Sequence, residues 1–281
     1  MKKKISLIVL LSAITLSMSS FGAKAVRTDT VPVIDGKLTE ECWEKAIPIN
    51  DFRVINSEEK AQYKTTARIL YNLDGLYFGV KCLRKDMKTI LTEKRERDGT
   101  VYRDESIEIM LDTNQDQQTY YHFVVNASGS IFDRVCDQGG FAGNSKWDGA
   151  VKAATYCGSD FWSCEIFIPF YTLQITPEVG ATWRLNIGRS AKNPEELSAI
   201  STDGTFNIAG SFATLTDLNA DFSKYCWVLE KPTSDTMVRA GKLDLKLNSR
   251  ITNNTGGKKL LSVECMLITH ISGFVFVSLL P

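Results

Sequence analysis

The chain has 281 residues, of which 43% are hydrophobic and 23% charged, a globular composition with room for one large domain or two smaller ones. Lysine plus arginine and aspartate plus glutamate number 33 each, so the net charge is zero. This balance argues against a nucleic-acid partner, and no run of like charges indicates an interaction tail.

Residues 1–25 have the three parts of a signal peptide. Three lysines at 2–4 precede the apolar run 5–16, which is short for a membrane span. Ala23-Lys24-Ala25 has the A-x-A form of a cleavage site. These features predict an exported chain, secreted, periplasmic or at the cell surface, that begins at Val26 and has no membrane span. An uncleaved anchor is the alternative, whereas a lipid anchor is not expected because no cysteine stands at the cleavage point.

Short apolar runs separated by turns rich in Gly, Asn and Asp predict about ten β-strands over residues 26–230. The predicted strands cover residues 31–34, 52–55, 65–71, 76–83, 106–112, 120–126, 150–156, 161–168, 182–190 and 212–218, with a further strand that starts at 130. Helix is expected only in single turns, one of them opened by Thr39 and anchored by Trp43. Residues 84–98 and 134–149 are predicted as long loops. This pattern favours an all-β fold, an antiparallel β-sandwich of the immunoglobulin or jelly-roll kind.

Residues 231–281 resume the alternation over 242–251, turn at 253–257 and begin again at 260. We interpret them as the start of a second β-domain that is truncated. A C-terminal anchor is the alternative, although the final apolar run is short for a span. Asn253 fits the N-x-[ST] pattern, which matters only in a glycosylating host.

The chain contains seven cysteines, an odd number that would leave one unpaired if disulfides formed. No C-x-x-C occurs, and the spacings match no zinc site. Cys82 and Cys164 lie inside apolar runs, so buried free thiols are the favoured interpretation.

Residues 101–133 predict an antiparallel meander of three strands. Strand parity places Ile107, Ile109 and Leu111 on one face with Tyr121, Phe123 and Val125, and this face is the expected core. The opposite face carries Glu108, Met110, Tyr120, His122, Val124 and Asn126. A carboxylate, an imidazole, an amide and an aromatic ring together suit a polar ligand. The plainer interpretation is a solvated outer face.

A series of short motifs between 31 and 218 resembles the carbohydrate-binding module family 9-like domains, which are DOMON-related β-sandwiches. In order, these are VIDG before Trp43, LYFGV at 76–80, YRDESIEIMLD at 102–112, YYHFVVNASG at 120–129, IPF at 168–170, WRLN at 183–186 and the closing F-x-x-L at 212–215. The resemblance implies a β-sandwich that binds sugars and often accompanies polysaccharide-degrading enzymes. It also implies that structural calcium can be present.

The resemblance further implies a sugar ring held between two aromatic side chains, with polar side chains on its hydroxyls. Tyr102 and Phe206 match the aromatic positions, Glu108 matches a hydroxyl-binding carboxylate, and His122 matches a polar residue of the neighbouring strand. Together with Asn126 from the parity argument, these are the predicted ligand-binding residues. Structural roles are the alternatives: Tyr102 at the sheet edge, Phe206 in the core, His122 as a satisfied histidine and Glu108 paired with an arginine.

Other classes of protein remain open alternatives. A glycoside hydrolase would use paired carboxylates, for which Glu108 with Asp104 or Asp133 are candidates, but any such activity is expected to belong to a partner enzyme. A haem-binding electron-transfer sandwich would use Met110 and His122 as axial ligands.

Calcium is a further alternative, because Asp112, Asn114 and Asp116 have the alternating oxygen spacing of a calcium loop. An ordinary Asx turn is favoured, since the glycine and the distal glutamate of an EF-hand are missing. No other cofactor and no catalytic residue is expected.

Overall fold

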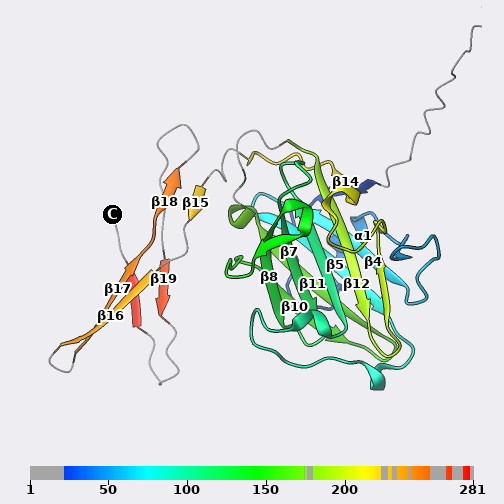
Figure 1. The fold of residues 1–281 in the computed structure, drawn as a ribbon, viewed down its shortest axis with the longest axis horizontal. Coiled ribbons are helices and arrows are strands. Elements are labelled where there is room, and N and C mark those ends of the chain that lie inside the picture. Colours follow the sequence, from blue (N-terminus) through cyan, green and yellow to red (C-terminus); the bar gives the residue numbers. More distant parts are fainter. Residues whose placement is uncertain are drawn as a thin grey trace, which may run out of the picture.

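The computed structural model describes residues 22–173, 175, 180–222, 227–229, 233–239, 242–253, 264–267 and 275–278. Residues 22–222 form two β-sheets packed face to face, which confirms the predicted β-sandwich (Figure 1). The nine-stranded sheet runs in the order β1 (Gly22–Lys24), β14 (Ala213–Thr216), β12 (Trp183–Ala191), β6 (Ser106–Asp112), β7 (Tyr120–Asn126), β8 (Ile131–Asp137), β9 (Ala142–Asn144), and β13 (Glu196–Ala199) joins β12 to β3 (Arg53–Val54). The five-stranded sheet runs β10 (Lys152–Cys157), β11 (Phe161–Pro169), β5 (Gly75–Leu83), β4 (Thr65–Tyr71), β2 (Val26–Arg27).

The core between the sheets follows the predicted parity. Ile107, Ile109 and Leu111 of β6 are buried with Phe123 and Val125 of β7. Each large apolar side chain removed from water stabilises the fold by about 1.5–3 kcal/mol. The inward residues of β6 and β7 therefore stabilise this central pair of strands, so the outward residues are not needed for the core and can bind a ligand.

The outward side of β6 and β7 is covered rather than solvated, so the plainer interpretation of this face was wrong. Residues 200–212, which include η5 (Ala209–Ser211), fold over it. The cover and the strands bury a second apolar cluster: Met110, Tyr120, Cys136, Ala199, Phe206, Ala209 and Phe212.

Helix is confined to short turns, as expected. They are α1 (Glu41–Lys45), η1 (Met87–Thr89), η2 (Val101–Arg103), η3 (Gln138–Gly140) and η4 (Phe170–Leu173), together with η5. Trp43 of α1 is buried, and its Nε1 donates a 2.8 Å hydrogen bond to Oε1 of Glu165. The prediction of Thr39 as the N-cap was wrong, because Glu40 holds that position without a side-chain hydrogen bond.

Several local predictions differ from the structure. Residues 31–34 form no strand: Val31 and Val33 are more than half exposed, and Ile34 packs against the buried cluster around Trp43 without pairing to a sheet. The loop expected over 134–149 contains the end of β8 and all of β9. Two pairs, β1 with β14 and β2 with β4, are parallel in a sandwich that is otherwise antiparallel. The missed strands β1, β2 and β13 have four residues or fewer, too few to show a period.

The strands after residue 226 pair only with one another in the part of the chain that the structure describes. They are β15 (Trp227–Leu229) with β18 (Ile251–Asn253), β16 (Thr233–Arg239) with β17 (Lys242–Asn248), and β19 (Glu264–Leu267) with β20 (Val275–Ser278). The alternation predicted from 242 is confirmed as β17, whereas a second domain over 231–281 stays a prediction.

The described part of the chain begins at residue 22, inside the predicted signal peptide. Residues 1–21 lie outside the described part, and Gly22–Lys24 form β1, with Ala23 and Ala25 buried in the core. Within the described residues we find no helix that is both long and apolar enough to cross a membrane. The five cysteines whose side chains are described are free thiols, and all but Cys157 are buried.

Candidate functional site

The outer face of the nine-stranded sheet contains a cavity of about 590 Å³, within the roughly 300–1,000 Å³ of small-molecule sites. Strands β6, β7, β8 and β12 form its floor, and residues 205–207 form part of its wall. The lining residues are Ile55, Tyr102, Glu108, His122, Val124, Phe132, Arg134, Gly143, Ser145, Ser190, Lys192, Glu195, Leu197, Thr205, Phe206 and Asn207. Four of the five predicted ligand-binding residues therefore line one cavity.

Cross-strand register brings the polar residues together. Met110 of β6 lies opposite His122 of β7, and His122 lies opposite Arg134 of β8. Glu108, one pair further along β6, is opposite Val124. Residues paired across neighbouring strands share a face of the sheet. Because the alternate apolar residues of β6 and β7 point inward to the core, these polar side chains point outward.

Glu108, His122 and Arg134 form a hydrogen-bonded chain across three strands. Nε2 of His122 lies 2.8 Å from Oε2 of Glu108, and Nε of Arg134 donates a 3.3 Å bond to Nδ1 of His122. In this arrangement Nδ1 is an acceptor and Nε2 carries the proton directed at Glu108. Glu108 is 7% exposed and His122 4% exposed, so both side chains are held rigidly at the wall of the cavity.

The buried Cys136 thiol contacts this chain and shifts two pKa values. Burial alone would lower the pKa of His122, but hydrogen bonds with Cys136 and Glu108 outweigh it and raise that pKa. Burial would raise the pKa of Cys136, but contacts with His122 and Tyr120 and the charge of Arg134 lower it.

The two predicted aromatic residues reach the cavity from different directions. Tyr102 in η2 is 46% exposed, and its ring meets Phe132 edge-on at 5.8 Å between centroids. Phe206 is only 6% exposed and rests on Gly188 of β12, where an added Cβ would lie 2.9 Å from the ring. An exposed ring suits stacking against a ligand, and a buried ring suits a fixed wall.

Asn126 does not line the cavity. Its Nδ2 donates to the backbone oxygen of Glu93 and to Oδ2 of Asp104, and its Oδ1 accepts from the backbone N–H groups of Ser128 and Ser130. The amide thus stabilises the turn between β7 and β8. The structure does not bring it together with the other four predicted residues.

The carboxylates proposed as hydrolase partners of Glu108 lie elsewhere. Asp104 pairs with Arg95 at 2.7 Å, and Asp133 pairs with Arg97; neither lines the cavity. The second carboxylate in the cavity is that of Glu195, which pairs with Lys192. The haem alternative also finds little support, because Met110 is fully buried in the apolar cluster and both ring nitrogens of His122 have protein partners.

The loop proposed for calcium supplies its own hydrogen bonds. Oδ1 of Asp116 accepts from the N–H groups of Gln118 and Thr119 at 2.7 Å, and its Oδ2 accepts from Asn114 Nδ2. Asp112 is buried, with Oδ2 bonded to the N–H of Gln117. This is the geometry of an Asx turn, in which the side-chain oxygens of Asn114 and Asp116 already accept hydrogen bonds, and calcium at this loop stays a prediction.

One acidic cluster occurs among the described residues. Carboxylate oxygens of Asp98, Asp133 and Asp148 lie within 4.8 Å of one another, beside Arg97. Burial raises the pKa of Asp98, and a hydrogen bond with Asp148 adds to the rise. The guanidinium and a shared proton thus offset the negative charge of the cluster.

A second cavity of about 890 Å³ lies beside Arg84, Tyr63 and Lys64. The guanidinium of Arg84 is buried and already bonds to Glu105, to the Thr89 hydroxyl and to backbone oxygens. Because the guanidinium of Arg84 already bonds within the protein, this cavity offers a ligand fewer unpaired polar groups than the cavity around His122 does.

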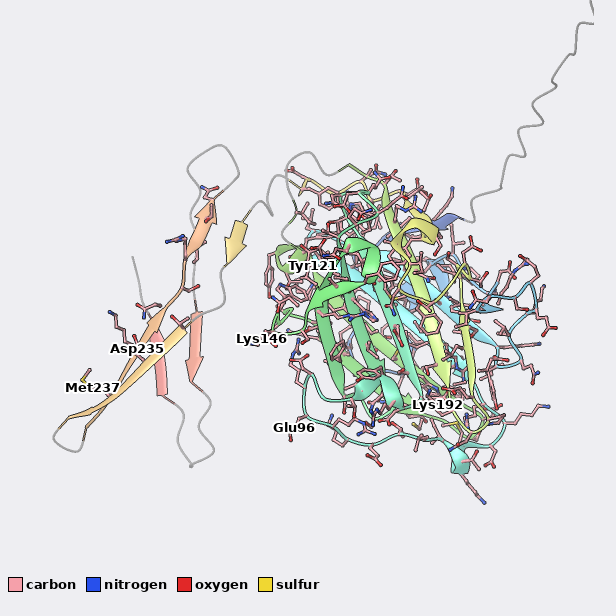
Figure 2. The ribbon with its side chains drawn as sticks, viewed as in Figure 1. Glu96, Tyr121, Lys146, Lys192, Asp235 and Met237 are labelled. Carbon is pink, nitrogen blue, oxygen red and sulfur yellow. The ribbon has the colours of Figure 1, made fainter. Side chains whose placement is uncertain are left out.

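Sequence reasoning missed eight polar or aromatic residues of the cavity: Phe132, Arg134, Ser145, Ser190, Lys192, Glu195, Thr205 and Asn207. Continuing the parity of His122 through the turn at 127–129 would have found Phe132 and Arg134, because the register is antiparallel. Ser190 and Lys192 come from the end of β12, where Figure 2 labels Lys192. No local pattern reveals that β12 lies beside β6.

Comparison with known proteins agrees with the β-sandwich fold. The family model described as carbohydrate family 9 binding domain-like matches residues 34–190, more than half of the chain. A family 9 carbohydrate-binding module from Caldicellulosiruptor kristjanssonii in complex with glucose has a TM-score of 0.52 at 16% identity, over 70% of this chain and 95% of that one. The same module in complex with cellotriose has a TM-score of 0.50 at 16% identity, over 70% and 93% of the two chains. A candidate carbohydrate-binding protein from Bacteroides uniformis has a TM-score of 0.55 at 16% identity, over 70% and 97%. No curated protein matches the sequence.

The β-sandwich and the family match define a carbohydrate-binding class of module. The chain belongs to the carbohydrate family 9 binding domain-like family, as its sequence motifs predicted. The family is one of binding modules rather than enzymes, and at the identities above the solved structures add the fold alone.

Proposed function

We propose that the chain is an exported, non-catalytic carbohydrate-binding protein that holds a mono- or oligosaccharide in the cavity of the nine-stranded sheet. The observation that carries this proposal is one cavity combining the exposed ring of Tyr102 with the buried polar pair Glu108 and His122. Aromatic faces stack on the C–H faces of pyranose rings, while carboxylates and imidazoles bond to hydroxyls. The family match supports the same class of ligand.

Each predicted residue has a defined role in this proposal. Tyr102 stacks on the sugar, and the ring of Phe206 contacts it as part of the cavity wall. Glu108 uses Oε2 for His122, and Oε1 has no protein partner among the described residues, so it can accept a hydroxyl from the sugar. Its orientation is fixed before the ligand arrives, which lowers the entropic cost of binding.

Isothermal titration calorimetry of the full chain with mono- and oligosaccharides, including glucose and cellotriose, tests this function. We expect saturable exothermic binding that falls at least about tenfold in Tyr102→Ala, because the stacking surface is lost. Tyr171→Ala is the matched control, since Tyr171 is 52% exposed and lies outside the cavity. A folded protein that binds no sugar would contradict the proposal.

The non-catalytic role is supported by the engagement of both cavity carboxylates. Glu108 bonds to His122 and Glu195 pairs with Lys192, so neither is placed as a free acid opposite a free base. We therefore assign polysaccharide cleavage to a partner glycoside hydrolase. The check is an assay of new reducing ends after incubation with soluble polysaccharides. Release that disappears in Glu108→Gln would mean that the chain is itself a hydrolase.

Export is proposed from the signal-peptide features of residues 1–25. Cleavage after Ala25 would remove β1, which pairs with residues 214–216 of β14. The mature chain would then expose the edge of β14 that β1 covers. Intact mass of the exported protein decides the point, with a start at Val26 expected. A mature chain that retains Gly22–Lys24 would place the cleavage site upstream of the A-x-A motif.

A further inference from the structure

Arg134 presents most of its guanidinium to the cavity without a protein partner. Its Nε donates to Nδ1 of His122, and among the described residues no carboxylate lies within 4.0 Å of its nitrogens. Neither Nη nitrogen donates to a described residue. The side chain is half-buried, so this charge is removed from part of its hydration without a compensating anion. Arginine has five N–H donors, and four of them remain for a ligand.

The other charged groups of the cavity already have protein partners. Glu108 bonds to His122, and Lys192 forms an ion pair with Glu195. Apart from His122, the cavity carries two carboxylates, one ammonium and one guanidinium. Arg134 is thus the cation that can take an anionic ligand group without breaking an existing ion pair.

The surroundings of Arg134 limit the shape of such a ligand. Gly143 of β9 lies alongside the arginine stem, where an added Cβ would be 3.6 Å from Cδ of Arg134. The rings of Phe132 and Tyr102 line the same cavity and offer an apolar surface to a ring. Ser190, a residue only 1% exposed, also lines the cavity, and its buried hydroxyl has no hydrogen-bond partner among the described residues. A buried hydroxyl without a partner is costly unless a ligand satisfies it.

We infer that the cavity recognises an acidic sugar, a hexuronic acid residue whose C6 carboxylate pairs with the guanidinium of Arg134. This inference rests on the proposed sugar-binding function and names the class of sugar. The planar fork of arginine binds a carboxylate through two parallel hydrogen bonds, which a neutral hydroxymethyl group cannot accept in the same way. The pyranose ring then lies against Tyr102, and a ring hydroxyl reaches Ser190.

The test compares sugars that differ only at C6. Calorimetry is performed with glucuronate against glucose, with galacturonate against galactose, and with trigalacturonate against its methyl ester. We expect each acid to bind at least about tenfold more tightly than its neutral counterpart, because a charge-assisted bidentate pair is added. The advantage should shrink as the salt concentration rises.

Variants at Arg134 separate this inference from the broader function. Arg134→Gln should bring the acid down to the affinity of the neutral sugar and leave neutral sugars within about twofold. Arg134→Lys should restore part of the preference, because it keeps the charge and loses the fork. Arg103→Gln is the control, since Arg103 is exposed beside Tyr102 and does not line the cavity. Circular dichroism and thermal unfolding check that each variant is folded.

The outcomes are distinct. Equal affinity for acid and neutral sugars would overturn the acidic-sugar inference and leave the sugar-binding function standing. A preference for acids that survives Arg134→Gln would overturn the role of Arg134. Absence of binding by every sugar, acidic or neutral, in the folded protein would overturn the sugar-binding function itself.

Discussion

Asp133 and Arg134 are neighbours in β8, but their side chains lie on opposite faces of the nine-stranded sheet. Asp133 is opposite Phe123 on the face toward the core, and Arg134 is opposite His122 on the face with the cavity. Asp133 is fully buried and receives Arg97 and the N–H of Gly149. Arg134 receives no carboxylate from the described part of the chain.

The same contrast holds for the two faces as a whole. At one end of the core, Glu105 is fully buried between Arg84 of one sheet and Arg189 of the other, and also accepts from Trp162. On the cavity face, the Nη nitrogens of Arg134 and the hydroxyl of Ser190 have no partner among the described residues. Both faces contain buried polar groups, so polarity alone does not identify a binding site. What separates Glu105 and Asp133 from Arg134 is that other described residues supply them with an opposite charge.

The largest expected effect on stability follows the removal of the buried, paired charge of Glu105 on the core side. Glu105→Gln places an amide where the carboxylate accepts five hydrogen bonds and leaves two buried guanidinium groups without an anion. We expect the free energy of unfolding to fall by about 3–5 kcal/mol, measured by urea denaturation. Glu41→Gln removes an exposed ion pair on α1 and should cost less than about 0.5 kcal/mol. A similar small loss for Glu105→Gln would mean that the buried cluster contributes little to stability.

The contribution of the core-side residue Asp133 to stability is expected to depend on pH. Burial raises its pKa from 3.8 to about 6, although the charge of Arg97 and the N–H of Gly149 lower it. The folded protein thus holds this proton more tightly than the unfolded chain does. Stability from the group is complete below about pH 4 and is lost as the pH rises through about 6.

Asp133→Asn should remove this dependence, since asparagine does not titrate. Between pH 4 and pH 6 the stability of the variant relative to the wild type should rise by about 2 kcal/mol, measured by urea unfolding at each pH. Asp137→Asn, at the exposed end of the same strand, should leave the slope unchanged. A difference between variant and wild type that is constant with pH would place the Asp133 pKa near its usual value.

The sequence predicted the faces of the sheet better than the position of residues along them. Alternation in β6 and β7 put Glu108 and His122 on the cavity face because a strand has a period of two. The same parity put Asn126 there, but parity gives only the face. Asn126 lies at the end of β7, where its side chain hydrogen-bonds to Asp104 and to the backbone of the following turn. These bonds stabilise the turn, and the side chain does not reach the cavity.

The rest of the site depends on contacts between distant segments. Charged residues interrupt the apolar pattern of β8, which hid Arg134 from a search for alternation. Ser190 and Lys192 reach the cavity only because β12 pairs with β6, about eighty residues earlier in the chain. Phe206 was predicted from family resemblance, since the loop that carries it has no regular period. Sheet order and loop placement are tertiary properties that local patterns do not contain.

The smallest effect on stability is expected on the cavity face, at Gly188. This residue lies opposite Glu108 in β6 and beneath the ring of Phe206. A Cβ at this position would lie 2.9–3.0 Å from three ring atoms of Phe206, so Gly188→Ala must displace the ring. We expect a change of about 1 kcal/mol in the free energy of unfolding, the low end for overpacking, because the buried ring lines the cavity on one side and can shift toward it. Sugar affinity should nevertheless fall about tenfold, measured by calorimetry.

Two further variants decide whether the ring transmits this effect. Gly180→Ala is the control, because an added Cβ there meets no atom within 4 Å, and both stability and affinity should stay unchanged. In a Phe206→Ala background, Gly188→Ala should cause no further loss of affinity, since the clash has been removed. An undiminished loss in that background would show that Gly188 acts on the ligand directly. Unchanged affinity in Gly188→Ala alone would remove Phe206 from the binding surface. In that second outcome the cavity would bind sugar through Tyr102 and the polar residues.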